Sequence, residues 1–271
     1  TVPQQALITE AQDLPAGDKG ALLTQVDLEG MKIGTLGGLT GDPALLPPGD
    51  VSSNPVLAPV VRNWAPGHEP NRGLVADMLT ILSDRTAHRE SLTALVRDGS
   101  YQGLVLDYRG LRAQDREAYA SFVTELAAAL HENGVWLAVT VDPPQLQPDD
   151  SWDTAGYDWM ALGTAADQLR VMMPLDPQAY VPGGQVEQQL AWATSQVNRY
   201  KLVPIFSTLS TDGKSSFTMD EVLAPLGELT APETLTESVA PGAALNFQLA
   251  DKATVEGDAL TGATRLHMGV S

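Results

Sequence analysis

Polar side chains follow a short apolar segment in the middle of the chain. The segment Gly103 to Leu106 has the length of a buried strand, and Asp107, Tyr108 and Arg109 come directly after it. In folds built from parallel strands and helices, ligands bind where the strands end at the carboxyl edge of the sheet. A carboxylate at such a place can transfer protons, whereas a guanidinium keeps its proton at physiological pH. The sequence therefore predicts that these three residues lie where chemistry would take place.

Two further carboxylates follow later apolar segments. Asp142 comes directly after one such segment, and Asp176 follows another. One explanation is a polar cup in which Asp107, Asp142 and Asp176 converge and bind a sugar or a cation, since hard cations prefer oxygen ligands. The other is that Asp107 pairs with Arg109 or another base, while the two later carboxylates cap loops or turns. The sequence leaves both explanations open.

The aromatic residues divide into two groups by their expected positions. Trp64, Trp152 and Tyr180 are expected on loops, where a flat ring can stack on a sugar or simply cover the core. Trp136 and Trp192 are expected inside a strand and a helix, where packing is the usual role. The first group therefore joins the candidate ligand-binding residues.

The sequence contains no pattern that indicates a metal or a cofactor. There is no glycine-rich phosphate loop, no Ser-His-Asp order and no zinc-binding spacing. The four histidines are scattered and are expected at the surface: His68, His88, His131 and His267. We therefore predict no cofactor and no metal site.

Composition narrows the class of partner. The 271 residues include 16 Lys and Arg against 34 Asp and Glu, a formal net charge of −18. Such a charge argues against nucleic acid or an anionic membrane surface as partner. No apolar run approaches the roughly 20 residues of a membrane-spanning helix, and the chain has no cysteine. We expect a processed or excised part of a larger extracellular or cell-surface protein.

Between about residues 55 and 207, segments typical of strands and helices alternate, which predicts βαβ units and a parallel sheet. Strands are expected at 55–61, 103–106, 135–141, 169–173 and 202–206. Arg62 and Asn63 form the polar rim of the first of these strands. Four helical faces are indicated by apolar spacing: Leu74, Met78, Leu79 and Leu82; Leu92, Leu95 and Val96; Tyr119, Phe122, Val123, Leu126 and Leu130; and Val186, Leu190, Ala193 and Val197.

The two ends of the chain show a different pattern. A hairpin-like strand pair is expected at 21–26 and 31–36, joined by a turn at Glu29 and Gly30. Near the other end we expect a short helix at 219–229 and antiparallel segments at 244–249 and 264–270. The predicted organisation is an N-terminal strand pair and loop at 1–50, a parallel β/α core at 51–211 and an insertion-like α+β region at 212–271.

The segment 101–111 resembles the signature strand of the glycoside hydrolase family 18 barrels, Asp-Gly-x-Asp-x-Asp-x-Glu. In that family, the final glutamate protonates the glycosidic oxygen. Aligned with this motif, Asp107 matches the third aspartate, while Gln102, Val105 and Arg109 stand at the first aspartate, the second aspartate and the glutamate. The resemblance implies an α/β fold of the (β/α)8 TIM-like type.

Further segments are similar to the branch of this family found in bacterial spore-germination and cell-surface proteins. Leu175 and Asp176 stand where the family has Tyr and Asp of Met-x-Tyr-Asp. The other similar segments are 55–64, 115–130, 135–144 and 157–163. The resemblance covers roughly residues 50–210, and a first and a final strand are hard to find. We therefore expect an incomplete or truncated barrel whose edge is completed by another segment of the parent polypeptide or by another subunit.

The same resemblance argues against the family's reaction. One carboxylic acid protonates the leaving oxygen while the acetamido carbonyl of the substrate attacks the anomeric carbon. Arg109 cannot supply that proton, and Val105 and Leu175 lack the groups that would assist it. We predict a non-enzymatic structural or interaction module. One alternative is lectin-like binding of a polysaccharide containing N-acetylglucosamine, chitin or peptidoglycan. The other is a glycosidase with altered chemistry that uses Asp107.

Overall fold

The computed structural model describes residues 5–8, 24–44, 55–207, 209–211, 216–218, 221–222, 253–257 and 264–268. The chain divides into two compact units. The first comprises Thr1–Met172 and Ala191–Ile205, and the second comprises Met173–Leu190 and Phe206–Ser271. These two units are not the three regions expected from the sequence. The three-part organisation stays a prediction.

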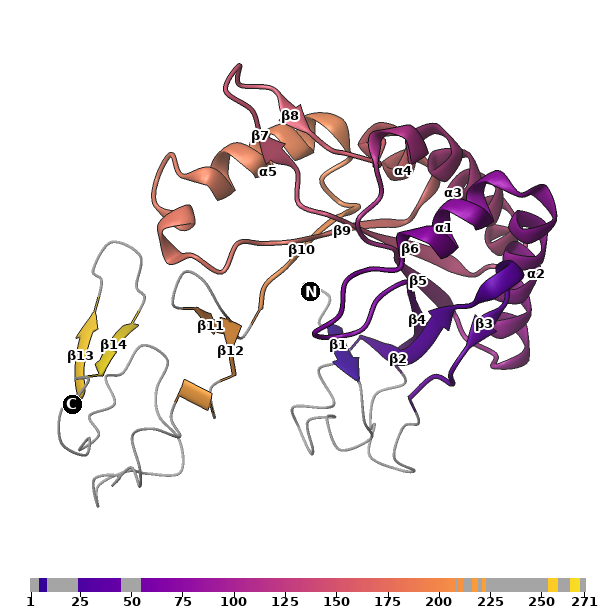
Figure 1. The fold of residues 1–271 in the computed structure, drawn as a ribbon, viewed down its shortest axis with the longest axis horizontal. Helices are drawn as coiled ribbons and strands as arrows, with labels where there is room; N and C mark the ends of the chain where they lie inside the picture. Colours follow the sequence, from indigo (N-terminus) through magenta and orange to yellow (C-terminus); the bar gives the residue numbers. More distant parts are fainter. Residues whose placement is uncertain are drawn as a thin grey trace. The chain divides into compact units, whose positions relative to one another are not determined.

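The first unit is built on an eight-stranded sheet (Figure 1). The order along the sheet is β1, β2, β4, β5, β6, β9 and β10, and neighbouring strands are parallel. The short strand β3 is the exception, since it pairs antiparallel with β2. The bounds are β1 Gln5–Ile8, β2 Gln25–Ile33, β3 Leu39–Thr40, β4 Val56–Arg62, β5 Gly103–Asp107, β6 Trp136–Val141, β9 Gln168–Met172 and β10 Leu202–Ile205.

From β4 onward, α-helices connect successive parallel strands, as the alternating sequence pattern predicts. The α-helices are α1 Arg72–Thr80, α2 Leu82–Asp98, α3 Arg116–His131, α4 Trp159–Ala165 and α5 Gln185–Gln196. Short 3-10 helices are η3 Thr35–Gly37, η4 Ala113–Asp115 and η5 Pro177–Tyr180. A small antiparallel hairpin, β7 Gln145–Leu146 with β8 Trp152–Asp153, lies between β6 and α4. In Figure 1, α1 to α4 lie along one side of the strands.

Helix α3 shows how the sequence pattern becomes packing. Asp115 precedes the helix and accepts a hydrogen bond from the backbone N–H of Arg112. Gly134 follows the helix with φ +70°, a conformation that glycine adopts without steric cost. The five apolar residues predicted to form one stripe are all buried: Tyr119, Phe122, Val123, Leu126 and Leu130. This face stabilises the helix by removing apolar surface from water.

The strands present different residues to their two sides. On one side, Val105 packs in an apolar cluster with Val60, Ala58 and Ala138 from the neighbouring strands. The hydroxyl of Tyr108 reaches His88 of α2 instead, on the helix-covered side. Side chains of a strand alternate between faces, so Asp107 shares the face of Val105, away from the helices.

A buried ion pair joins two strands that are not neighbours in the sheet. Nη1 of Arg170, on β9, donates to Oδ2 of Asp27, on β2, at 2.5 Å, and both side chains are buried. Gln25 donates to Asp27, and Arg170 also donates to Gln168. Strands β4, β5 and β6 lie between β2 and β9 in the sheet. The sheet must therefore curve strongly, as it does in a barrel.

The fold is mixed α/β with a mostly parallel central sheet, consistent with a TIM-barrel-like fold. Within the described residues, strand pairing ends at β1 on one side and at β10 on the other. Closure of the barrel is therefore not shown, and completion of its edge by another segment stays a prediction.

The expected N-terminal hairpin is wrong. Residues 25–33 form one continuous strand, β2, which pairs in parallel with β4 on both sides of an irregularity between Leu28 and Met31. Gly30 lies there with φ +119°, and a Cβ at this position would overlap the carbonyl oxygen of Asp42. The glycine therefore forms a bulge inside a strand rather than a turn between two strands. Strand β1 also pairs with β2 in parallel.

The second unit contains short antiparallel pairs. Strand β11 (Ser210–Thr211) pairs with β12 (Ser216–Phe217), and β13 (Ala253–Gly257) pairs with β14 (Thr264–Met268). The predicted antiparallel character of this region is thus found for the segment 264–268. The predicted segment 244–249 and all but residues 221–222 of the predicted helix 219–229 lie outside the described residues.

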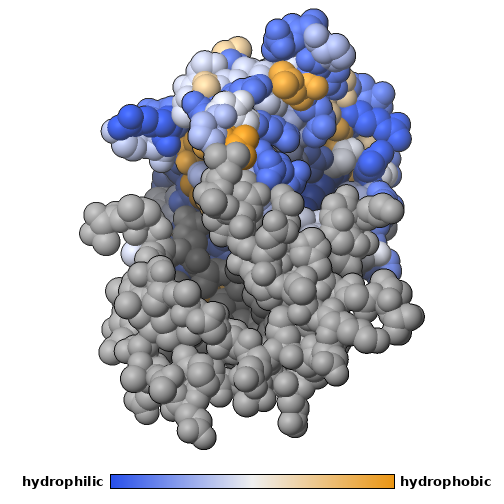
Figure 2. Space-filling view, turned by 90° about the vertical axis from the view of Figure 1, so that its left-hand side faces the viewer, coloured by the Kyte–Doolittle hydropathy of each residue, from blue (hydrophilic) through white to orange (hydrophobic). Residues whose placement is uncertain are grey.

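The described surface is mainly hydrophilic on the side shown in Figure 2, with small hydrophobic patches between polar areas. Among the described residues, no helix has both the length and the apolar character needed to cross a membrane.

Candidate functional site

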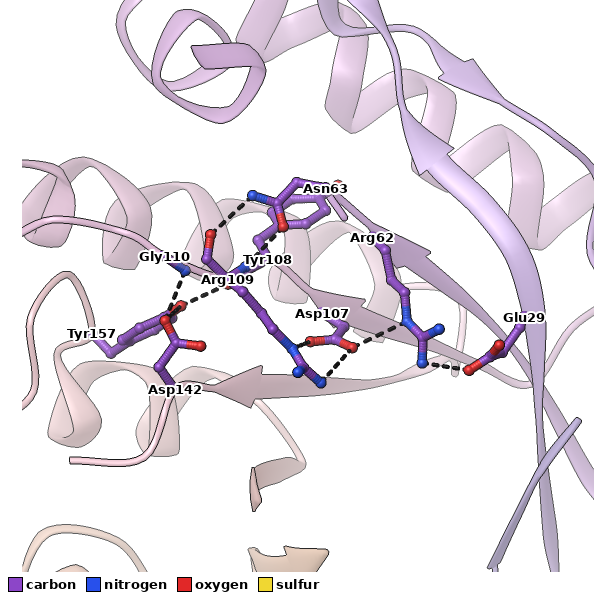
Figure 3. A network of polar contacts seen from close by, with 9 residues as sticks. All are labelled: Glu29, Arg62, Asn63, Asp107, Tyr108, Arg109, Gly110, Asp142 and Tyr157. Carbon is purple, nitrogen blue, oxygen red and sulfur yellow. Dashed lines mark hydrogen bonds and ion pairs between the residues drawn. The ribbon is translucent and has the colours of Figure 1, made fainter. Parts of the chain in front are cut away.

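A connected set of polar residues lies at the carboxyl ends of β4, β5 and β6 and beside the middle of β2 (Figure 3). Its members come from the middle of β2, from the last residues of β4 and β5 and the residues that follow them, from the residue after β6, and from the segment before α4. They are Glu29, Arg62, Asn63, Asp107, Tyr108, Arg109, Gly110, Asp142 and Tyr157. We call this set the edge network. It occupies the edge at which parallel α/β folds bind ligands.

Asp107 is the centre of a chain of alternating charges. Its Oδ1 accepts from Nε of Arg109 at 2.8 Å, and its Oδ2 accepts from Nε of Arg62 at 3.1 Å and from Nη2 of Arg109 at 3.2 Å. Arg62 also pairs with Glu29 at 2.5 Å. The Asp107 side chain is 5% exposed, so these cations compensate a carboxylate that has lost nearly all its water. The sequence left two explanations for Asp107 open: a polar cup shared with two other aspartates, or pairing with a base such as Arg109. The structure shows the pairing with Arg109.

Asn63 fixes the backbone of the residue that stands at the acid position of the family motif. Its Oδ1 accepts from the backbone N–H of Arg109 at 2.8 Å, and its Nδ2 donates to the carbonyl of Arg109 at 3.0 Å. Asn63 is buried. The sequence placed Asn63 at the rim of a strand, but nothing in the sequence indicated this two-sided contact.

Asp142 directly follows β6, the strand beside β5, and lies next to the segment that contains Arg109 and Gly110. Its Oδ2 accepts from the backbone N–H of Gly110 at 2.7 Å and from the hydroxyl of Tyr157 at 3.1 Å. The hydroxyl of Tyr157 also contacts the carbonyl of Tyr108 at 2.8 Å. Burial first, and then the charge of Asp142, raise the pKa of Tyr157 above its ordinary value. Tyr157 therefore stays protonated and acts as a hydrogen-bond donor.

Trp64 is in contact with two cations of the edge network. The guanidinium carbons of Arg62 and Arg109 lie 4.3 Å and 4.0 Å from its ring centroid. Such cation–π contacts help to order both arginines. A sugar could stack on Trp64 only where a guanidinium does not already cover the ring.

The structure places the side chain of Tyr108 away from the strand edge. Its ring is fully buried, and its hydroxyl lies 2.5 Å from Nε2 of His88. Nδ1 of His88 lies 3.0 Å from the carbonyl of Gly37. Only the backbone carbonyl of Tyr108 takes part in the edge network, because alternate side chains of a strand point to opposite faces.

The expectation that all four histidines lie at the surface is wrong for His88. This side chain is fully buried, and burial lowers its pKa to about 4, although the hydrogen bond with Gly37 acts in the opposite direction. A carbonyl only accepts, so Nδ1 carries the proton, and Nε2 accepts from the Tyr108 hydroxyl. His68 and His131 are exposed, and the side chain of His267 lies outside the described residues.

Trp152 packs against other aromatic residues. Its ring stacks on Trp192 at 5.6 Å between centroids, and Trp192 also contacts Trp159 at 4.9 Å. Trp152 thus attaches the β7–β8 hairpin to the part of α5 that carries Trp192. Its use as a sugar platform stays a prediction.

The remaining predicted site residues belong to the second unit. Asp176 accepts from the backbone N–H of Gln178 at 2.9 Å, which caps η5. The hydroxyl of Tyr180 donates to the carbonyl of Pro174 at 2.8 Å, and its ring lies 6.2 Å from that of Phe206. Convergence of Asp176 with Asp107 and Asp142 stays a prediction, and so does stacking of a sugar on Tyr180.

Metal-ligand clusters are not found in the described part of the chain, where no three His, Cys, Asp or Glu side chains are grouped to hold an ion. Val105, where the family motif has a carboxylate, is buried in an apolar cluster. The edge network therefore offers paired charges, one tyrosine hydroxyl and one carboxylate, Asp142, that forms no ion pair with a described residue.

Two curated proteins of Bacillus subtilis (strain 168) are similar in sequence. One is named an uncharacterized glycosylase, YvbX, and is 30% identical over 97 residues, which are 34% of this chain. The other is named a cortical fragment-lytic enzyme and is 26% identical over 133 residues, which are 45% of this chain. The matched regions span only 28% and 31% of these relatives. The chain matches no protein-family model.

Solved structures share the fold over nearly the whole chain. A chitinase from Chromobacterium violaceum ATCC 12472 has a TM-score of 0.66 at 20% identity, covering 98% of this chain and 82% of its own. The spore cortex-lytic enzyme SleL of Bacillus megaterium QM B1551 has a TM-score of 0.67 at 14% identity, covering 96% and 60%. At these identities the likeness concerns the fold.

These comparisons overturn one prediction. The sequence predicted that the chain is not an enzyme, whereas the similar proteins are named as glycosylases, chitinases and cortex-lytic enzymes, which points to an enzyme. The prediction was based on residues that do not match one catalytic arrangement, and this mismatch does not exclude another arrangement. The fold is the one found in chitinases and spore cortex-lytic enzymes.

Proposed function

We propose that this chain is a glycosylase domain that acts on a polysaccharide containing N-acetylglucosamine, such as chitin or peptidoglycan. Two findings support the proposal: the fold is that of chitinases and cortex-lytic enzymes, and the similar curated proteins carry glycosylase or lytic names. The relation to the spore-germination and cell-surface branch is part of the same proposal.

The observation that carries the proposal is the edge network itself. Polar side chains from adjacent strands meet at the carboxyl edge, and hydrogen bonds fix each of them. Burying so many charges inside a fold is costly unless every group is paired. If this part of the fold needed only stability, apolar residues could supply it, as Val105 does nearby in its apolar cluster. The presence of carboxylates at this edge of the sheet favours a role in binding or reaction.

The chemistry must differ from that of the family motif. Glycosidic cleavage needs an acid that gives a proton to the leaving oxygen. Arg109 cannot do so, and both oxygens of Asp107 accept from guanidinium groups. We therefore propose a glycosidase with altered chemistry in which Asp107 holds Arg62 and Arg109 in place.

Lectin-like binding of the same polysaccharides is the second candidate. It is favoured by the ion pairing of Asp107 and by the aromatic ring of Trp64 beside the network. Binding without turnover would distinguish it from the first candidate.

The setting of the domain is also a proposal. We propose a secreted or cell-surface location in a bacterium, in keeping with the cortex-lytic names of the similar proteins. We further propose that another segment of the parent polypeptide, or another subunit, pairs with the edge of the sheet.

Turnover tests the proposal directly. Purified protein is incubated with chitooligosaccharides and with peptidoglycan fragments, and new reducing ends are measured. We expect new reducing ends that increase linearly with protein concentration. Retention on chitin or peptidoglycan without any new reducing ends would support the lectin alternative. Neither retention nor turnover on any of these polymers would contradict both candidates.

A further inference from the structure

We infer that Asp142 is the general acid of this site, and the inference rests on the proposed glycosylase function. Its position, its hydrogen bonds and its lack of a cationic partner among the described residues each support this assignment. The residue directly follows β6, one strand away from the motif that carries the acid in the similar family.

The sheet register places Asp142 beside Arg109. Strands β5 and β6 pair in parallel, with Leu106 opposite Val139 and Asp107 opposite Thr140. Continued by two residues, this register brings position 109 opposite position 142. The hydrogen bond from the backbone N–H of Gly110 to Asp142, at 2.7 Å, shows that the two loops remain adjacent beyond the strands. A carboxylate therefore stands on the neighbouring strand at the level of position 109.

The hydrogen bonds hold one oxygen of Asp142 and leave the other available. Oδ2 accepts from the backbone of Gly110 and from the hydroxyl of Tyr157, whereas Oδ1 has no hydrogen-bond partner among the described residues. These two contacts orient the carboxyl group. Asp142 is only partly buried, so Oδ1 can reach a ligand. Figure 3 shows Oδ2 directed at Gly110 and Tyr157.

The charges of the edge network separate the roles of its two central carboxylates. Asp107 is bound by Arg62 and Arg109, so both of its oxygens already accept from guanidinium groups. No Lys, Arg or His of the described part of the chain lies within ion-pair distance of Asp142. Of these two carboxylates, Asp142 is therefore the one with an oxygen open to a ligand and no cationic partner among the described residues.

The reaction begins with transfer of the proton on Oδ1 of Asp142 to the glycosidic oxygen. The bond between the anomeric carbon and that oxygen breaks, and its electron pair stays with the oxygen. The acetamido carbonyl oxygen of the substrate bonds to the anomeric carbon and forms a cyclic cation. Water then bonds to the anomeric carbon, gives a proton to the Asp142 carboxylate and releases the acetamido oxygen. One glycosidic bond and one water are consumed, and Asp142 regains its proton.

Dependence on the leaving group tests this role. A general acid matters for a sugar leaving group, which needs a proton, and matters little for dinitrophenolate, which leaves without one. We expect Asp142→Asn to slow hydrolysis of chitooligosaccharides by about 100-fold or more. The same variant should slow the initial release of dinitrophenol from a dinitrophenyl N-acetylglucosaminide by less than about 10-fold.

Two further variants keep the test decisive. Asp98→Asn changes an exposed carboxylate at the end of α2 and should leave both rates unchanged. Asp142→Glu retains a carboxylic acid and should recover part of the activity on chitooligosaccharides, which also shows that losses in Asp142→Asn are not caused by misfolding. Circular dichroism and thermal melting verify folding of each variant.

The outcomes separate the inference from the proposed function. If the unmodified protein hydrolyses none of the substrates, the proposed function fails and the assignment falls with it. If it does hydrolyse them, equal rates in Asp142→Asn and the unmodified protein would overturn the assignment alone. Equal losses on both kinds of substrate would overturn it as well, because a general acid discriminates between leaving groups.

Discussion

At the residue scale, the environment of each ionisable group decides its role more than its type does. Asp107 and Asp142 have the same side chain and lie at the ends of adjacent strands. Asp107 is buried between two guanidinium groups, while Asp142 is partly exposed and bound by a backbone N–H and a tyrosine hydroxyl. The first arrangement occupies both carboxylate oxygens with guanidinium donors, whereas the second leaves Oδ1 of Asp142 without a partner among the described residues.

His88 gives a prediction about pH at the same scale. Burial lowers its pKa to about 4, below the ordinary value of 6.5, so the unfolded chain binds this proton more tightly than the folded protein does. Stability associated with His88 is therefore complete above pH 6.5 and is lost as the pH falls toward 4. Between pH 7.5 and pH 5.0 we expect a loss of about 2 kcal/mol in the free energy of unfolding from this residue.

Urea denaturation of the unmodified protein and of His88→Gln at both pH values measures the effect. The variant loses the titrating group but keeps polar atoms that can contact Gly37 and Tyr108. Its stability should therefore fall by about 2 kcal/mol less between the two pH values. An identical pH dependence in both proteins would contradict the role assigned to His88.

At the element scale, the bulge in β2 determines how the strand pairs with β4. Gly30 combines φ +119° with a close approach of the Asp42 carbonyl, whose oxygen occupies the space that a Cβ would need. We expect Gly30→Ala to lower the free energy of unfolding by about 3 kcal/mol or more, because it adds both backbone strain and a steric clash.

A matched control is available at Gly67. This glycine also has a positive φ, +74°, but no atom lies within 4 Å of a Cβ there. Gly67→Ala should cost only about 1 kcal/mol, from backbone strain alone. Chemical denaturation of both variants gives the comparison. Equal losses in the two variants would show that contact with Asp42 does not matter.

The alternation of strands and helices could be predicted from sequence, whereas the pairing of the N-terminal segment could not. Stripes such as that of α3 repeat with the helical period, so local spacing reveals them. Glu29 and Gly30 have the composition of a turn, and only the parallel partners on both sides of β2 show a bulge instead. Strand pairing depends on residues far away in the chain.

At the scale of the whole first unit, a buried ion pair links strands from opposite parts of the sheet. Asp27 of β2 and Arg170 of β9 are both buried. Removing one partner leaves an uncompensated charge, so Arg170→Met should lower the free energy of unfolding by about 3 to 5 kcal/mol.

Removing both partners should cost much less. In the double variant Asp27→Leu with Arg170→Met, no charge is left buried, and apolar side chains of similar volume fill the space. We expect the double variant to be more stable than Arg170→Met alone, as measured by urea denaturation. A double variant that is less stable than both single variants would contradict the expected coupling.

The sequence alone determined the class of fold and the strand edge where the polar residues gather. Both follow from local patterns: the periods of apolar residues and the polar residues that end each strand. It also showed that Arg109 cannot be the acid. Tertiary structure decided which groups meet. The guanidinium groups of Arg62 and Arg109 converge on Asp107, and Gly110 and Tyr157 converge on Asp142. Residues far apart in the chain are brought together by the register of adjacent strands, which no local spacing contains.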